Sequence, residues 1–138
     1  MTMQIAPLGL DHVVLRIADL DRSLAFYCDV LGCVLDRRRD DLGLYHLSAG
    51  TAQVDLVTLA GNLGQKGGGP AAQQGRNMDH FCLRIEPFDG PALQEYLRGH
   101  GLEPGEITQR YGAMGEGPSL YVQDPDGNTV ELKGPAVS

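Results

Sequence analysis

Two histidines at equivalent points of a repeated sequence are the first candidates for chemistry. His12 lies in LDHVVLRI at 10–17, and His80 lies in MDHFCLRI at 78–85. Imidazole is the commonest metal ligand among side chains and can also act as a general acid or base. A single histidine on an apolar strand is more often a hydrogen-bonded core residue. A pair at matching positions of two similar halves favours a shared cleft.

Two carboxylates accompany the histidines, each embedded in an apolar run near the end of its half. Asp55 lies in AQVDLVTL and Glu131 lies in NTVELKG. A buried carboxylate without a partner is costly, and a cation bound by two imidazoles and one or two carboxylates would satisfy all these groups together. The alternative at both positions is a carboxylate turned outward from an edge strand. This set contains no thiolate, leaves open coordination positions and suits divalent Ni, Zn, Fe or Mn better than a closed structural zinc site.

Two copies of one βαβββ unit would position these four side chains. In each copy the histidine strand is followed by a helix with a capping aspartate, Asp19 or Asp21 in the first and Asp89 in the second. Three short extended runs follow each helix, at 33–39, 43–49 and 52–59, and again at 105–111, 118–123 and 128–133. One helix over a four-stranded sheet leaves a face uncovered, so two units would pair within the chain or across a dimer. The pattern predicts an α+β fold of two βαβββ modules in tandem.

The chain is predicted to form a single domain over 1–138, with module one at 8–60, a linker at 61–77 and module two at 78–134. The linker GNLGQKGGGPAAQQGRN has no periodicity, which is typical of a mobile connection or of a lid over a site. The glycine-rich stretch 109–119 is expected to be a loop at the mouth of the cleft.

Composition narrows the classes of partner. The chain has 11 basic and 18 acidic residues and a net charge of −7, which disfavours nucleic acid and anionic membranes. No apolar run is long enough to span a bilayer, and no signal peptide is recognisable. Three cysteines that follow no ligand spacing indicate a reducing cytoplasm. We expect a cytoplasmic protein with a small-molecule substrate and neither a nucleic-acid nor a membrane partner.

The sequence resembles the vicinal oxygen chelate superfamily, which includes glyoxalase I, extradiol dioxygenases, fosfomycin-resistance proteins and bleomycin-binding proteins. The resemblance rests on LDHVVLRIADLDRSLAFYCDVLG, MDHFCLRI and YVQDPDGNTVELKG in this order. It implies the glyoxalase/bleomycin-resistance/dioxygenase-type fold and a divalent metal bound by His12, His80 and Glu131. It also implies a role for Asp55 as a further ligand, direct or through water. Members of the fold form their sites within one chain or across a dimer, and we expect a homodimer.

The resemblance favours a glyoxalase-like lyase or isomerase, similar to lactoylglutathione lyase, acting on a substrate chelated through vicinal oxygens. The metal would polarise a carbonyl, and Asp55 or a displaced Glu131 would be the catalytic group that moves a proton between adjacent carbons. Leu59 stands where glyoxalase I has an asparagine, which weighs against glutathione as the thiol of a thiol-adduct substrate. The candidate substrate-binding residues are Arg16, Arg84, His46, Tyr111 and Tyr121.

Three other functions remain open at this stage. The first is an Fe(II) extradiol-type dioxygenase, for which the two histidines and Glu131 suffice as ligands. The second is a thiol transferase of the fosfomycin-resistance type, and the third is a drug-binding protein without catalysis. An intact metal triad weighs against the third.

Overall fold

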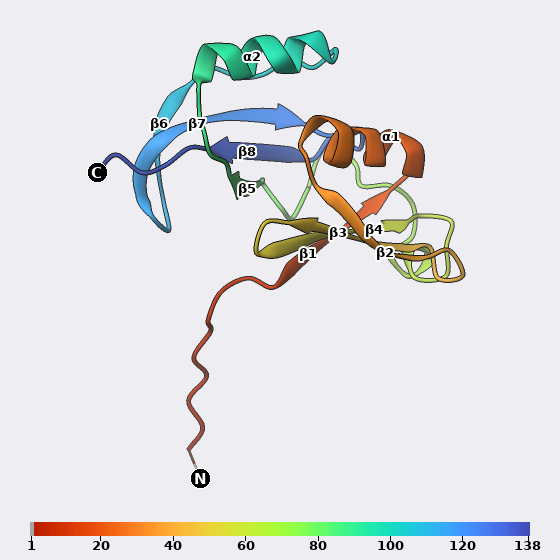
Figure 1. The fold of residues 1–138 in the computed structure, drawn as a ribbon. Coiled ribbons are helices and arrows are strands. Elements are labelled where there is room, and N and C mark those ends of the chain that lie inside the picture. The colour runs from red at the N-terminus through yellow and green to blue at the C-terminus, as the bar shows by residue number, and fades with distance from the viewer. Residues whose placement is uncertain (1) are drawn as a thin grey trace. The chain divides into compact units, whose positions relative to one another are not determined.

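The computed structural model describes residues 2–138, whose contacts divide them into two compact units (Figure 1). Unit 1 comprises the described residues up to Ala18 together with Gly32–Pro70, and unit 2 comprises Asp19–Leu31 and Ala71–Ser138. Each unit contains one four-stranded sheet. No helix within residues 2–138 is long and apolar enough to cross a membrane.

The sheet of unit 1 is built from β1 (His12–Ile17), β2 (Val34–Arg39), β3 (Leu44–Ala49) and β4 (Ala52–Thr58), in the order β1-β4-β3-β2. β1 runs parallel to β4, and the two remaining pairs are antiparallel. The histidine strand therefore lies directly beside the strand that carries the first buried acid.

The sheet of unit 2 repeats this topology with β5 (Phe81–Arg84), β6 (Thr108–Gly112), β7 (Gly115–Gln123) and β8 (Thr129–Lys133), in the order β5-β8-β7-β6. Its histidine strand again runs parallel to the strand that carries an acid. The predicted α+β fold of two tandem βαβββ modules is confirmed.

The two predicted helices begin at the aspartates expected to cap them. α1 (Leu20–Leu24), which continues into the π-helical segment η1 (Ala25–Val30), is capped by Asp19, and α2 (Gly90–Gly99) is capped by Asp89. Each carboxylate accepts a hydrogen bond from a backbone N–H of the first turn, at 3.0 and 3.2 Å. A short 3₁₀ turn, η2 (Gly64–Gly67), lies in the linker.

α1 follows β1 in the chain, yet its contacts assign it to unit 2. The Tyr27 hydroxyl donates to the Asp124 carboxylate at 2.6 Å, and the Tyr96 hydroxyl of α2 donates to the Val30 carbonyl at 2.7 Å. Both helices thus belong to the unit that contains the second sheet.

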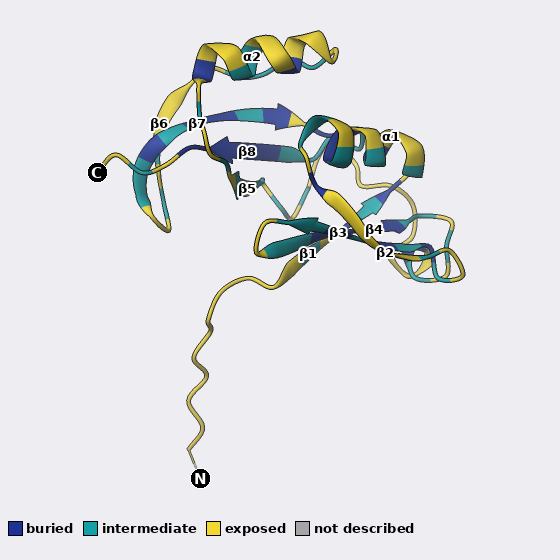
Figure 2. Ribbon diagram, in the orientation of Figure 1, coloured by how far each residue is buried: buried dark blue, intermediate teal, exposed yellow. Residues whose placement is uncertain are grey.

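The buried residues concentrate in strands β4, β7 and β8 (Figure 2). The buried core includes Leu15, Ile17, Leu47, Val54 and Leu56 in the first sheet, Leu120, Val122, Val130 and Leu132 in the second sheet, and Leu97 in α2. Burying such a side chain contributes roughly 1.5–3 kcal/mol. The packing of these side chains stabilises the strands that carry the candidate site.

The expectation of a loop over 109–119 was wrong, because this stretch forms the β6–β7 hairpin. Its glycines make room for a lysine. A Cβ at Gly112 would lie 3.3 Å from Cε of Lys133, and one at Gly117 would lie 3.0 Å from its Nζ. The glycine content therefore reflects close packing within a sheet.

Candidate functional site

Unit 1 contains an open pocket of about 650 Å³ that brings several predicted site residues together. His12 and Arg16 reach it from β1, His46 from β3 and Asp55 from β4. Apolar side chains and Lys66 of the linker complete its wall. Alternation along β1 predicts that His12 and Arg16 face the same side, and both line this pocket.

Asp55 is the buried acid of this pocket, with only 3% of its surface exposed. Its Oδ2 lies 3.0 Å from Nδ1 of His46, which is its partner across the β3–β4 pair. Its Oδ1 is buried and has no hydrogen-bond partner among the described residues. Leaving a buried polar atom unpaired costs about 1–3 kcal/mol. β4 is a central strand, so Asp55 does not turn outward from an edge, and its free oxygen suits a cation or a proton donor.

Both candidate metal-binding histidines contact the aspartate that precedes them. Nδ1 of His12 lies 2.6 Å from Asp11, and Nδ1 of His80 lies 2.7 Å from Asp79. The contact with Asp11 raises the pKa of His12, and the negative charge of Asp55 adds to this effect while desolvation opposes it. A histidine that binds a metal usually donates its other ring N–H to a carboxylate, which orients the ring. In each Asp–His pair Nε2 is therefore the ring nitrogen that could bind a metal.

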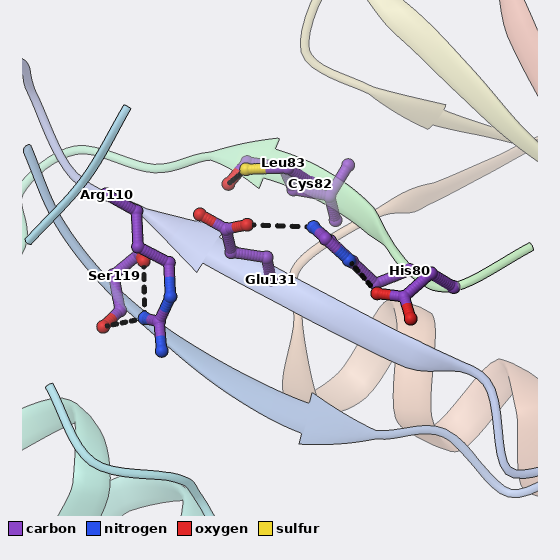
Figure 3. Close-up of polar contacts among 7 residues, drawn as sticks. His80, Cys82, Leu83, Arg110, Ser119 and Glu131 are labelled. Atoms are coloured by element: carbon purple, nitrogen blue, oxygen red, sulfur yellow. Dashed lines mark hydrogen bonds and ion pairs between the residues drawn. The ribbon is translucent and has the colours of Figure 1, made fainter. Parts of the chain in front are cut away.

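In unit 2, His80 and Glu131 point toward each other (Figure 3). Nε2 of His80 lies 3.1 Å from Oε1 of Glu131, and Glu131 is 5% exposed on the central strand β8. The alternative of an outward carboxylate on an edge strand is wrong here too. Two ligands that each lie about 2.1 Å from an ion, at right angles, are about 3 Å apart. The spacing of this pair and the donor types therefore fit a divalent ion.

Tyr121 and Arg110 flank this pair. The Tyr121 ring packs edge-on against the His80 ring, with centroids 5.1 Å apart. The Arg110 guanidinium lies 4.2 Å from the Tyr121 centroid. It donates to the carbonyl and hydroxyl oxygens of Ser119 at 3.0 and 2.8 Å, and Figure 3 shows this contact. This stack fixes the orientation of the His80 ring.

Other predicted substrate-binding residues lie in more exposed positions. Tyr111 is 80% exposed on β6, and Arg84 is an exposed residue at the end of β5. Within residues 2–138, no group of three or more His, Cys, Asp or Glu side chains is close enough to hold a metal ion. Each unit contributes one histidine and one carboxylate of the predicted ligand set.

The histidine and carboxylate of each unit, His12 with Asp55 and His80 with Glu131, are called half-sites below. Three residues near them were not predicted as site residues from the sequence. Lys66 lines the pocket of unit 1. In unit 2, Cys82 is opposite Glu131 in the β5–β8 register, and desolvation, then the Glu131 charge, raises the pKa of its thiol to about 11. Lys133 is 5% exposed and donates from Nζ to the Gly115 carbonyl at 2.9 Å. Cys82 and Lys133 carried a signal, since they stand two residues after His80 and Glu131 and so face the same side of the sheet as these residues. Lys66 carried none.

Comparisons with known proteins agree with this architecture. Residues 9–132 match the profile of the Glyoxalase/Bleomycin resistance protein/Dioxygenase superfamily. A probable lactoylglutathione lyase of Synechocystis sp. is 31% identical over 127 residues, which cover 88% of this chain and 91% of that protein. A lactoylglutathione lyase of Arabidopsis thaliana is 34% identical over 128 residues, which cover 88% of this chain and 42% of that longer protein. A solved structure from the mobile metagenome of V. Pseudocholerae is 30% identical, with a TM-score of 0.72 and coverage of 97% and 98% of the two chains.

Proposed function

Because the chain belongs to the glyoxalase/bleomycin resistance protein/dioxygenase superfamily, we propose that it is a metal-dependent lyase or isomerase. Its substrate would be a small molecule that chelates a divalent ion through two adjacent oxygens. Relatives named lactoylglutathione lyase support the reaction class. The observation that carries the proposal is Oδ1 of Asp55, a buried carboxylate oxygen without a hydrogen bond beside the pocket that His12 also lines.

The proposed metal ligands are Nε2 of His12, Nε2 of His80 and a carboxylate oxygen of Glu131. Asp11 and Asp79 would keep the two rings oriented through their Nδ1 atoms. A bound divalent ion would supply the Lewis acidity that polarises a substrate carbonyl. The donor set admits nickel, zinc, iron or manganese. The proposal includes the homodimer and the cytoplasmic location expected from the sequence.

Asp55 would carry the proton in this reaction. Oδ1 accepts a proton from the carbon beside the polarised carbonyl and returns it to the neighbouring carbon. His46 holds Oδ2 at 3.0 Å, so the free oxygen is the one that can move the proton. Val14 on β1 and Val57 on β4 form apolar parts of the pocket wall.

Metal content and proton exchange test the proposal together. Tag-free wild type should contain one metal per site by mass spectrometry, while His12→Ala and Glu131→Gln should lose it. The wild type should isomerise hemithioacetals of 2-oxoaldehydes and, in deuterium oxide, incorporate deuterium at the reacting carbon. Absence of metal after reconstitution, or metal without any such exchange, would refute the proposed reaction. Bound iron together with oxygen consumption on catechols would instead identify a ring-cleaving dioxygenase.

A further inference from the structure

The side chain of Arg16 fastens the segment 64–69 to β1. Its Nε and Nη2 donate to the Gly64 carbonyl at 3.3 and 2.8 Å, and its Nη1 donates to the Gly69 carbonyl at 3.0 Å. Nη2 also donates to the Gly68 carbonyl. Because a guanidinium has five N–H groups, at least four of them are used on the backbone of this segment. One side chain thus holds the short 3₁₀ turn η2 and the two glycines that follow it.

Glycine is required where this segment meets Arg16. A Cβ at Gly67 would overlap the guanidinium group. Gly68 has a φ of +77°, in the left-handed region that other residues avoid. The glycine run that predicts a mobile connection therefore permits a backbone packed against an arginine.

Lys66 lies inside the fastened segment and lines the same pocket as His46 and Asp55. Two cations, Arg16 and Lys66, and one carboxylate thus border a pocket in a chain whose net charge is −7. The Arg16 donors are largely occupied by carbonyls. Among residues 2–138, the ammonium group of Lys66 has no hydrogen-bond or ion-pair partner, so it is the cation with donors left for a ligand.

We propose that Lys66 binds a carboxylate group of the substrate and that Arg16 is a positioning residue that holds Lys66 at the pocket. This inference rests on the proposed function in taking the pocket of unit 1 as the substrate pocket. A single ammonium group matches a single negative charge, whereas phosphoryl groups are more often bound by several donors of arginine or of a helix N-terminus. The substrate would carry vicinal oxygens at one end and a carboxylate at the other. Its middle part would contact apolar residues of the wall such as Leu44 and Val57.

A matched pair of probes tests this assignment. 2-Oxoglutarate and 2-oxopentanoate have equal chain length and the same vicinal oxygens, and only the first has a distal carboxylate. Amide resonances of residues 64–69 would be followed by two-dimensional NMR while each probe is titrated into zinc-loaded and metal-free protein. The wild type should bind 2-oxoglutarate about fivefold more tightly, which is the size of a partly exposed ion pair.

Variants distinguish the effect of the Lys66 charge from the effect of the Arg16 hydrogen bonds that hold residues 64–69. Lys66→Gln should abolish the preference and Lys66→Arg should keep it. Arg37→Gln removes an equal charge from an exposed position of β2, outside the pocket lining, and should leave the preference unchanged. Arg16→Lys should speed amide hydrogen exchange in residues 64–69 and reduce the preference although Lys66 is present.

Two results would overturn the inference: equal affinity of the wild type for the two probes, including no measurable binding of either, or an undiminished preference in Lys66→Gln. The outcome is distinguishable from failure of the proposed function. A protein that holds no metal but prefers the dicarboxylate would refute the proposed chemistry and retain the carboxylate site. A protein with metal and turnover but no such preference would do the reverse.

Discussion

The two units carry the same framework with different contacts. In unit 1 the acid Asp55 is paired in register with Val14, two residues after His12, and in unit 2 the acid Glu131 is paired with Cys82, two residues after His80. The longer side chain of Glu131 comes within 3.1 Å of Nε2 of its histidine. Asp55 instead contacts His46 and leaves Oδ1 without a hydrogen bond.

The two units also differ in the residue that lies opposite the acid on the next strand, β3 in unit 1 and β7 in unit 2. His46 is the cross-strand partner of Asp55, and Tyr121 is the cross-strand partner of Glu131. A histidine can hold a carboxylate by a direct polar contact, whereas Tyr121 packs its ring against His80. Under the proposed function, this difference would make His80 and Glu131 of unit 2 a preformed pair of metal ligands and Asp55 of unit 1 the proton-transfer group. The two copies of the module thus share a backbone arrangement but differ in the contacts of their buried acids.

The largest expected effect comes from breaking the ligand pair of unit 2. Glu131→Gln should retain less than a tenth of the wild-type metal and lose about 10³-fold or more in activity, since the Lewis acid supplies several kcal/mol. His12→Ala should do the same. Metal analysis and initial rates check both, and a variant that keeps its metal would remove Glu131 from the ligand set.

Mixing these two inactive variants tests how the half-sites combine. If a homodimer builds each site from two copies, half of the randomly paired dimers carry one intact site, and about a quarter of the activity returns. If each site forms within one chain, every site carries one of the two substitutions and no activity returns. Co-refolded wild type serves as the control for losses in handling.

The next effect should come from Asp55→Asn. Loss of a general base typically costs 10²–10⁴-fold in rate, and the metal content should stay at the wild-type value because Asp55 is not one of the three proposed ligands. This outcome would show that Asp55 and Glu131, which occupy equivalent positions of the repeat, have different roles. Loss of the metal in this variant would instead make Asp55 a ligand, and the two halves would then be alike in role.

The repeat alone predicted the equivalence of the two halves, because the DH pairs and the late acids are visible at matching places in the sequence. The cross-strand partners of the two acids could not be predicted in this way. Placing His46 opposite Asp55 requires the register of β3 against β4, and a shift of one residue would reverse every side chain on the strand. Tyr121 was a candidate on residue type, while its packing against His80 depends on β7 pairing with β8.

Two further features depended on contacts that residue patterns do not encode. An amphipathic helix shows which of its faces is apolar but does not specify which sheet it covers, so the assignment of α1 to unit 2 could not be predicted. The segment 64–69 has no periodicity, and its order comes from Arg16, which lies about fifty residues earlier in the chain. Lys66 was therefore passed over as part of a flexible linker.

Removal of the aspartates beside the two proposed metal-binding histidines should have a moderate effect. Asp11→Asn and Asp79→Asn should each weaken metal binding about 10- to 100-fold, as loss of a residue that orients a ligand does. Asp36→Asn, an exposed change on β2, is a matched control and should leave metal affinity unchanged. Competition with a fluorescent chelator measures all three. An unchanged affinity in Asp79→Asn would mean that the stack with Tyr121 alone orients His80.

The smallest effect concerns Cys82, whose thiol pKa is raised to about 11 by desolvation first and by Glu131 second. The thiolate is the reactive form, so only about one molecule in a thousand is reactive at Cys82 at pH 8, and alkylation should be slow although the residue is exposed. In metal-free protein, Glu131→Gln should lower this pKa and speed alkylation severalfold, while desolvation keeps it slower than in an unfolded chain.

Peptide mass spectrometry reports the three cysteines separately, and Asp55→Asn, which changes the equivalent acid of unit 1, provides the control. Equal acceleration in both variants would show that Cys82 responds to a general loosening and not to its cross-strand partner, because only Glu131 faces it in the β5–β8 register.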